Sequence, residues 1–185
     1  GERVGWTTTA SFKVADREWV NDKKMTMLGR FQTQKLLREM VDAGCRYAIV
    51  ETSSQGIMQS RHIGINYDLV AFTNLTPEHI EAHGGFENYK AAKGKLFDRL
   101  HHVSRKTVDG REIEKSIVVN LDDAYAEYFL SFKADRYAGV SWKEVSPELI
   151  KRLNTNPVQA QSVQFEGQCT TFSLSDTIMH FKPIG

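Results

Sequence analysis

Polar residues that could do chemistry follow two short apolar runs of this chain. Glu51 comes directly after the run Tyr47–Val50, and Thr73 and Asn74 come directly after the run Leu69–Phe72. Both runs have the β-rich, continuously apolar character of buried parallel strands. In a parallel sheet with helices on its faces, ligands collect outside the carboxyl ends of the strands. The sequence therefore predicts an active site built from these polar residues.

Two histidines and a lysine follow in the next segment. Thr76-Pro77 is a helix-start signature, with Thr76 as N-cap and Pro77 at the first helical position. His79 and His83 lie four residues apart, so they share one face of that short helix. Taken alone, such a pair is more often a solvated helix face than a metal site, and a helical lysine such as Lys93 is usually a surface residue.

The elements that would position these residues alternate between helix and strand. A helix is predicted over 31–43, Gly44 is well placed to end it, and a strand follows over 45–50. The longest helix is predicted over 86–102, and a strand over 116–120 ends in Asn120. Further strands are predicted within 1–20 and over 67–72, 137–140 and 179–182, short helices over 56–60, 124–132 and 147–153, and an antiparallel hairpin from 160–165 and 170–174.

Composition narrows the class of protein. The 185 residues are 41% hydrophobic and 25% charged, with a formal net charge of +1. A near-neutral balance gives no electrostatic reason to expect a nucleic-acid partner or an anionic membrane. Cys45 and Cys169 are far apart and outside any CxxC pattern, which argues against a zinc site or a disulfide framework. With no apolar run of membrane-spanning length and no secretory signal, we expect a cytoplasmic protein without a membrane partner.

Several motifs at fixed spacing resemble the central ATP-binding domain of the Mur ligases. They are the LLREM run at 36–40, the ETSSQGIMQSR segment at 51–61, and the segment from Phe72 to Phe97 that contains FTNL, EH, HGG and AAK. The resemblance covers most of residues 20–135, and it is strongest to the tripeptide synthetases, which add the third amino acid of the peptidoglycan stem. These ligases use ATP to phosphorylate a substrate carboxylate, and an amine then attacks the acyl phosphate.

The resemblance implies catalytic and metal-binding roles for three residues. Glu51 matches the carboxylate that holds Mg²⁺ near the γ-phosphate, and His79 matches a histidine near the metal. Lys93 matches a lysine that the family carbamylates, and its carbamate would help to bind a second Mg²⁺. A buried lysine with a lowered pKa presents the neutral amine that CO2 requires.

The resemblance also implies substrate contacts. Positions that contact UDP-MurNAc are matched by Thr26, Ser53, Gln59 and Arg61, with Arg61 supplying positive charge. Asn74 and Asn120 lie where the nucleotide would bind. The implied ligands are therefore ATP, Mg²⁺, a UDP-MurNAc-dipeptide and an incoming amino acid.

The chain departs from the family pattern in several places. It contains no GxxGK[ST] phosphate loop, whose N–H groups and lysine would cradle the ATP phosphates. Gln55 replaces a histidine, Glu78 replaces the aspartate before His79, and Met27-Leu28 replace the Thr-Pro of a TTP motif. The last change removes a hydroxyl that would contact the sugar nucleotide. We expect partner segments or domains of the ligase to supply what is missing, and the chain alone to be catalytically inactive.

These inferences define one overall expectation. The fold is α/β, a mainly parallel sheet flanked by helices, forming a single incomplete Mur ligase central domain over 1–185. Residues 1–135 form its α/β core, and 136–185 add one more strand and an antiparallel β extension. The function is ATP-dependent amide-bond formation in peptidoglycan precursor synthesis. Two alternatives stay open: a folylpolyglutamate or cyanophycin synthetase-type ligase, and a non-catalytic remnant that binds a partner or ligand.

Overall fold

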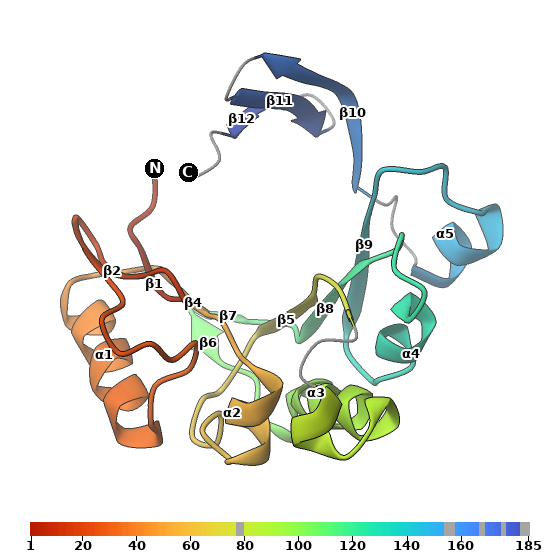
Figure 1. Ribbon diagram of the computed structural model, residues 1–185. Helices are drawn as coiled ribbons and strands as arrows, with labels where there is room; N and C mark the ends of the chain where they lie inside the picture. Colours follow the sequence, from red (N-terminus) through yellow and green to blue (C-terminus); the bar gives the residue numbers. More distant parts are fainter. Residues whose placement is uncertain (77–79, 154–157, 167–168, 175–176, 182–185) are drawn as a thin grey trace. The chain divides into compact units, whose positions relative to one another are not determined.

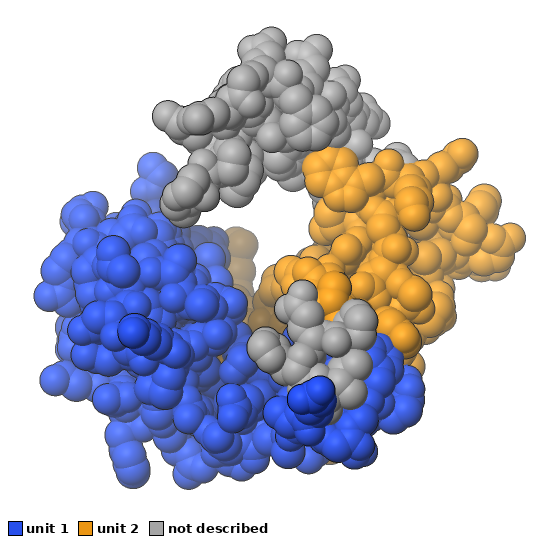
Figure 2. All heavy atoms as spheres, viewed as in Figure 1, with its two compact units in different colours: residues 1–66, 79–96 blue, residues 67–78, 97–185 orange. Residues whose placement is uncertain are grey.

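The computed structural model describes the backbone of residues 1–76, 80–153, 158–166, 169–174 and 177–181, and the side chains of residues 1–76 and 81–153. The chain divides into two compact units, coloured separately in Figure 2. The first unit comprises residues 1–66 and 79–96, and the second comprises residues 67–78 and 97–185. Each unit has a sheet of its own.

The first unit is built on a four-stranded sheet in the order β3-β2-β1-β4 (Figure 1). Its strands are β1 (Val4–Thr7), β2 (Ser11–Val14), β3 (Arg17–Val20) and β4 (Tyr47–Val50). The first three form an antiparallel meander, whereas β4 runs parallel to β1, with Thr7 paired to Val50. The chain segments after β1 and β4 therefore leave the sheet at the same edge.

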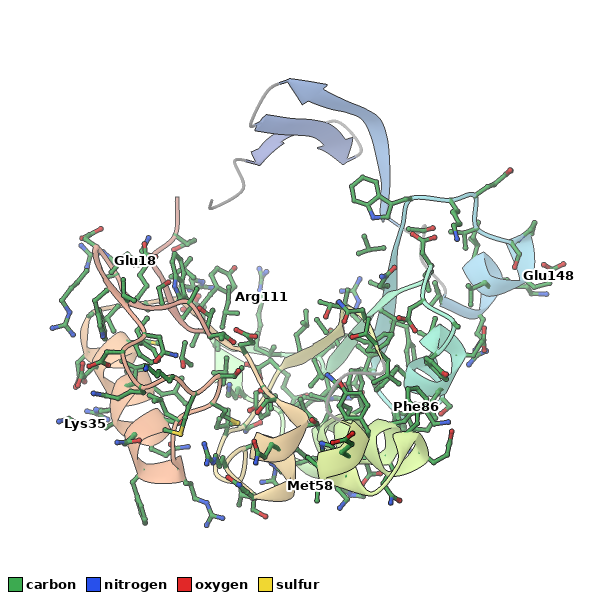
Figure 3. The ribbon with its side chains drawn as sticks, viewed as in Figure 1. Glu18, Lys35, Met58, Phe86, Arg111 and Glu148 are labelled. Atoms are coloured by element: carbon green, nitrogen blue, oxygen red, sulfur yellow. The ribbon has the colours of Figure 1, made fainter. Side chains whose placement is uncertain are left out.

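Helix α1 (Arg30–Asp42) packs against β1 and β2. Its buried residues join a core cluster with residues of β2, and Lys35 marks its solvent side in Figure 3. The core cluster consists of Phe12, Val14, Leu28, Leu36 and Met40. Gly5 lets the helix approach the sheet closely, because a Cβ there would lie 2.5 Å from Met40 Cγ. Gly44 follows the helix with φ +72°, a conformation that glycine adopts without strain.

Three more helical elements follow the first sheet. Helix α2 (Ser54–Met58) comes directly after β4, and the 3₁₀ helix η1 (Ile80–His83) precedes the long helix α3 (Phe86–His102). The amino-terminal part of α3 belongs to the first unit and its carboxyl-terminal part belongs to the second.

The second unit is built on a six-stranded sheet in the order β12-β11-β10-β9-β8-β5. Its strands are β5 (Leu69–Phe72), β8 (Ser116–Asn120), β9 (Arg136–Ser141), β10 (Val158–Glu166), β11 (Cys169–Leu174) and β12 (Thr177–Phe181). Strands β5, β8, β9 and β10 pair in parallel, and β10, β11 and β12 pair antiparallel. The antiparallel part is the predicted extension near the carboxyl terminus.

Helices pack on the parallel part of this sheet. Helix α4 (Ala126–Leu130) contacts β8, and α5 (Pro147–Leu153) contacts β9. An aromatic cluster binds the layers together: the ring of Phe129 on α4 stacks on Phe72 of β5, with centroids 3.9 Å apart, and lies 4.7 Å from Phe97 of α3. Such burial of large apolar surface is the main stabilising contribution in the unit.

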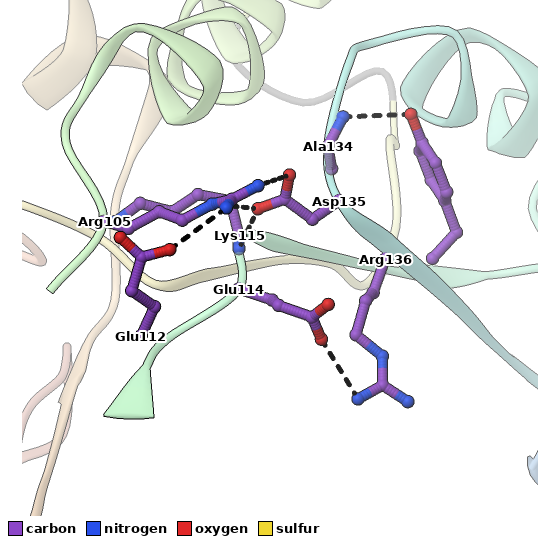
Figure 4. A network of polar contacts seen from close by, with 8 residues as sticks. Arg105, Glu112, Glu114, Lys115, Ala134, Asp135 and Arg136 are labelled. Carbon is purple, nitrogen blue, oxygen red and sulfur yellow. Dashed lines mark hydrogen bonds and ion pairs between the residues drawn. The ribbon is translucent and has the colours of Figure 1, made fainter. Parts of the chain in front are cut away.

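A small hairpin of β6 (Thr107–Val108) and β7 (Arg111–Glu112) joins α3 to β8. Beside it, the guanidinium of Arg105 binds Asp135 in a fork, with Nη2–Oδ1 at 2.6 Å and Nε–Oδ2 at 3.1 Å (Figure 4). Arg105 also pairs with Glu112 at 3.3 Å, and the backbone N–H of Lys115 donates to Asp135 at 2.7 Å. This network fixes the entry into β8 and β9.

The predicted fold class is confirmed, and most element boundaries agree within two residues. The main corrections concern short elements. Helix α2 begins two residues earlier than predicted, because Ser53 caps it, and α4 is shorter than the predicted helix over 124–132. The parallel strands are also divided: β4 pairs with β1 and β5 pairs with β8, so they lie in different sheets. The predicted helix start at Thr76-Pro77 lies partly outside the described residues.

Candidate functional site

The first site residue, Glu51, is held by Thr9 at the carboxyl end of β4. The N–H of Thr9 donates to Glu51 Oε2 at 2.7 Å, and the hydroxyl of Thr9 donates to Oε1 at 2.9 Å. The same hydroxyl oxygen lies 2.9 Å from the hydroxyl of Thr26. The parallel pairing of β1 with β4 explains this arrangement, since it delivers the segments after both strands to one edge. The predicted residues Glu51 and Thr26 are therefore brought together.

Lys93 lies half-buried on α3, within the first unit. Burial lowers the pKa of Lys93 below its ordinary value of 10.5, and the negative charge of Glu51 raises this pKa in partial compensation. The ammonium Nζ lies 5.3 Å from the ring centroid of Tyr89, one helical turn earlier. Its half-buried position distinguishes Lys93 from a surface lysine, and the carbamylation of Lys93 stays a prediction.

The two serines after β4 have different partners. Ser53 is the N-cap of α2, and its Oγ accepts a hydrogen bond from the N–H of Gly56 at 3.1 Å. Ser54 is buried, and its Oγ lies 3.0 Å from Nε2 of His83, which is also buried. A Cβ at Gly56 would lie 2.8 Å from Met27 Sδ, so a larger residue there would require the Met27 side chain to shift.

Arg61 and Gln59 lie just after α2. Nη1 of Arg61 donates to the backbone carbonyl of Met27 at 2.5 Å, which ties it to the segment that carries Thr26. Ser60, between the two predicted substrate contacts, has φ +57°, and its carbonyl accepts two hydrogen bonds from the guanidinium of Arg30, at 3.1 and 3.3 Å. The turn that presents Gln59 and Arg61 is thus clamped to the start of α1.

The predicted nucleotide residues belong to the second unit, where polar side chains fix the loops after three strands. The Asn120 amide donates to the carbonyl of Thr73 at 2.8 Å, and Asp123 accepts from the N–H of Leu75 at 3.0 Å. Asn74 itself is exposed. Asn120 therefore connects the loop after β8 to the loop after β5.

A neighbouring aspartate fixes the loop after β9. Asp122 accepts from the hydroxyl of Ser141 and from the N–H of Trp142, both at 2.7 Å. Burial by itself raises the pKa of Asp122, but these hydrogen bonds outweigh it and lower the pKa overall. The indole of Trp142 is left 56% exposed at the end of β9.

Some predicted features fall outside what the structure describes. His79 is one of them, so its predicted role stays a prediction. Among the described residues, no group of three or more histidine, cysteine, aspartate or glutamate side chains is arranged to hold a metal ion. Within the same part of the chain, no helix has the length and apolar character needed to cross a membrane.

Sequence reasoning missed Thr9 and the pairing of Ser54 with His83. Thr9 ends a run of three threonines after a strand-like segment, and its position after a strand end is the same signal that points to Glu51. The pairing of Ser54 and His83 had no signal in the sequence, because residues 29 positions apart meet only in the folded chain.

Comparisons with known proteins agree with this fold. The family model of the Mur ligase middle domain matches residues 2–182, so the chain belongs to the Mur ligase family. A solved structure of a UDP-N-acetylmuramoyl-L-alanyl-D-glutamate–2,6-diaminopimelate ligase covers 97% of the chain with a TM-score of 0.68. Because the two sequences are only 20% identical, this structural similarity supports the fold alone.

Curated proteins of similar sequence are also named as tripeptide synthetases or diaminopimelate ligases. The chain is 35% identical over 132 residues to UDP-N-acetylmuramyl-tripeptide synthetase of Roseiflexus sp. (strain RS-1), covering 70% of this chain and 26% of that protein. It is 31% identical over 159 residues to a 2,6-diaminopimelate ligase of Geobacillus thermodenitrificans (strain NG80-2), covering 85% of this chain and 31% of that protein. The chain thus spans between a quarter and a third of these relatives' length.

Proposed function

We propose that this chain is the central part of a ligase that forms an amide bond on a UDP-MurNAc-dipeptide. The reaction would proceed through an acyl phosphate made with ATP, which implies a cytoplasmic location. Membership of the Mur ligase family and the names of the relatives support this proposal. The structural observation that carries it is the placement, within one unit, of Glu51 braced by Thr9 and of Lys93 with a lowered pKa.

Mg²⁺ is the cofactor that this arrangement favours. Glu51 is exposed, and its carboxylate keeps lone pairs beyond the two that accept from Thr9, so it fits a hard cation. Lys93 would supply further oxygen ligands as a carbamate, and the burial that lowers its pKa favours the neutral amine that CO2 needs. His79 would be the third metal-site residue. When bound, Mg²⁺ would neutralise charge on the phosphates of ATP.

The sugar-nucleotide substrate would contact Thr26, Ser53, Gln59 and Arg61. Each of these residues is attached to the edge of the first unit that carries Glu51, either directly or through the turn after α2. Arg61 would meet an anionic group of the substrate, because a guanidinium makes charge-assisted hydrogen bonds to phosphate and carboxylate.

ATP would contact Asn74 and Asn120 in the second unit. The sequence contains no GxxGK[ST] loop, so the backbone N–H groups that cradle phosphates in other ligases are not supplied by such a motif here. We therefore expect this 185-residue chain alone to bind its sugar-nucleotide substrate without turning over ATP. A non-catalytic binding protein is the second candidate function, and an ADP-release assay with every substrate present would exclude it if turnover occurred.

Calorimetric titration with UDP-MurNAc-L-Ala-D-Glu tests the proposal. We expect the chain to bind this substrate, and the variant Arg61→Met to bind it roughly tenfold to a hundredfold more weakly, as expected for the loss of a charge-assisted hydrogen bond. Arg38→Met is the matched control, since Arg38 is an exposed arginine paired with Asp42 on α1 and should leave binding unchanged. Equal loss in both variants, or no binding by the unaltered chain, would contradict the proposal.

A further inference from the structure

A buried polar pair links the segment after β4 to the turn before α3. Ser54 Oγ and His83 Nε2 lie 3.0 Å apart, and each residue is only 8% exposed. Both belong to the first unit, but they come from different elements, α2 and η1. This hydrogen bond is therefore a tertiary connection between two short helical segments.

The pair is incomplete, which argues that it serves more than stability. The other ring nitrogen of His83, Nδ1, is buried and has no hydrogen-bond partner among the residues that the structure describes. A buried polar atom left unpaired is destabilising, whereas two apolar side chains of similar shape would fill the same space without that penalty. An unpaired buried polar atom departs from the rules of stable packing, and such departures are expected at functional sites.

His83 is also held in place from α3. Its ring packs against Tyr89, with centroids 5.1 Å apart, and its carbonyl accepts a hydrogen bond from the side chain of Asn88 at 3.0 Å. Tyr89 in turn lies under the ammonium of Lys93. The ring of His83 thus stands between the turn of α3 that carries Lys93 and the residue that follows Ser53.

We propose that His83 is a positioning residue that fixes the segment Glu51–Ser53 relative to Lys93 through its hydrogen bond to Ser54. The role rests on the proposed function, because its purpose is to keep the substrate-binding serine and the Glu51 carboxylate in register with α3. His83 itself touches neither the substrate nor the metal in this account. The proposed role depends neither on the spacing between His79 and His83 in the sequence nor on metal binding by His83.

The double variant Ser54→Ala/His83→Phe separates positioning from stability. Phenylalanine keeps a ring against Tyr89, and alanine removes the partner hydroxyl, so no buried polar atom is left unpaired and the fold should be retained. We expect this variant to unfold at the same urea concentration as the unaltered chain or at a higher one, yet to bind UDP-MurNAc-L-Ala-D-Glu at least tenfold more weakly. His83→Gln, which can still reach Ser54 with an amide, should restore binding. Unchanged affinity in the double variant would overturn the inference.

Amide hydrogen exchange gives a readout that needs no ligand. The N–H of Gly56 donates to Ser53, and the N–H of Thr9 donates to Glu51, so both amides report on the geometry of the segment Glu51–Ser53. We expect at least tenfold faster exchange at these two amides in the double variant, with exchange on α1 unchanged. Equal exchange rates would overturn the positioning role. If the unaltered chain binds no substrate, the proposed function fails, and the exchange rates alone decide the role of His83.

Discussion

At the scale of single residues, the chemistry is concentrated on Glu51 and Lys93. Glu51 is an ordinary strand-end carboxylate in sequence, and only the fold shows that both of its oxygens accept hydrogen bonds from Thr9. Lys93 is half-buried on α3, which disfavours its charged form, whereas Lys95 of the same helix is exposed. Burial and neighbouring charge, rather than residue type, therefore distinguish the candidate site.

The lowered pKa of Lys93 predicts a particular pH dependence of stability. Between this lowered pKa and 10.5, the unfolded chain binds more protons at Lys93 than the folded chain does, so raising the pH stabilises the fold. Compared with Lys93→Met, the unaltered chain should gain unfolding free energy as the pH rises from about 7 to about 10. Urea unfolding in buffer free of CO2 measures this difference.

The control for this prediction is Lys95→Met, at an exposed position of the same helix. That variant should track the unaltered chain across the whole pH range. A free-energy difference between the unaltered chain and Lys93→Met that stays flat with pH would show that burial does not disfavour the charged lysine.

At the scale of elements, the sequence predicted the long and strongly patterned segments well. Helix α3 and strand β8 have the predicted bounds, since periodicity and glycine signals specify such segments locally. Short elements were less predictable: the start of α2 depends on the cap bond between Ser53 and Gly56. That cap bond is local, whereas the tertiary contact between Ser54 and His83 joins residues 29 positions apart and leaves no periodic trace in the sequence.

The network beside the β6–β7 hairpin makes a testable element-scale prediction. Hydrogen bonds from Arg105 and from the N–H of Lys115 lower the pKa of Asp135. The charged carboxylate of Asp135 therefore stabilises the fold at any pH above its ordinary pKa of 3.8. This stabilisation is lost as the pH falls through the lowered pKa of the folded chain. Asp135→Asn should reduce the unfolding free energy slightly at neutral pH, because the pair is largely solvated, and the difference should vanish in strong acid.

Glu114→Gln is the comparison for Asp135→Asn. Glu114 pairs with Arg136 at 3.4 Å through a single contact between two exposed side chains, so its loss should have a smaller effect at neutral pH. Equal effects of the two substitutions on urea unfolding would argue against a special role of the Arg105 fork.

At the scale of the whole molecule, the sequence predicted the family and the fold class, and both predictions rested on the spacing of its motifs. It did not predict that the parallel strands divide between two sheets, because strand pairing is a long-range property. The candidate site divides in the same way: Glu51 and the proposed sugar-nucleotide contacts belong to the first unit, and Asn74 and Asn120 belong to the second. Each unit therefore makes its own contribution to the proposed reaction.

The measurement that tests the central claim most directly is an amide NMR titration of the ¹⁵N-labelled chain with UDP-MurNAc-L-Ala-D-Glu. The account predicts that the resonances that shift belong to the edge of the first unit, at Thr9, Thr26, Ser53, Gln59 and Arg61. UDP-GlcNAc, which lacks the peptide, should cause smaller shifts at the same positions. Shifts that are absent, or that cluster away from this edge, would contradict the assignment of a Mur ligase substrate site to these residues.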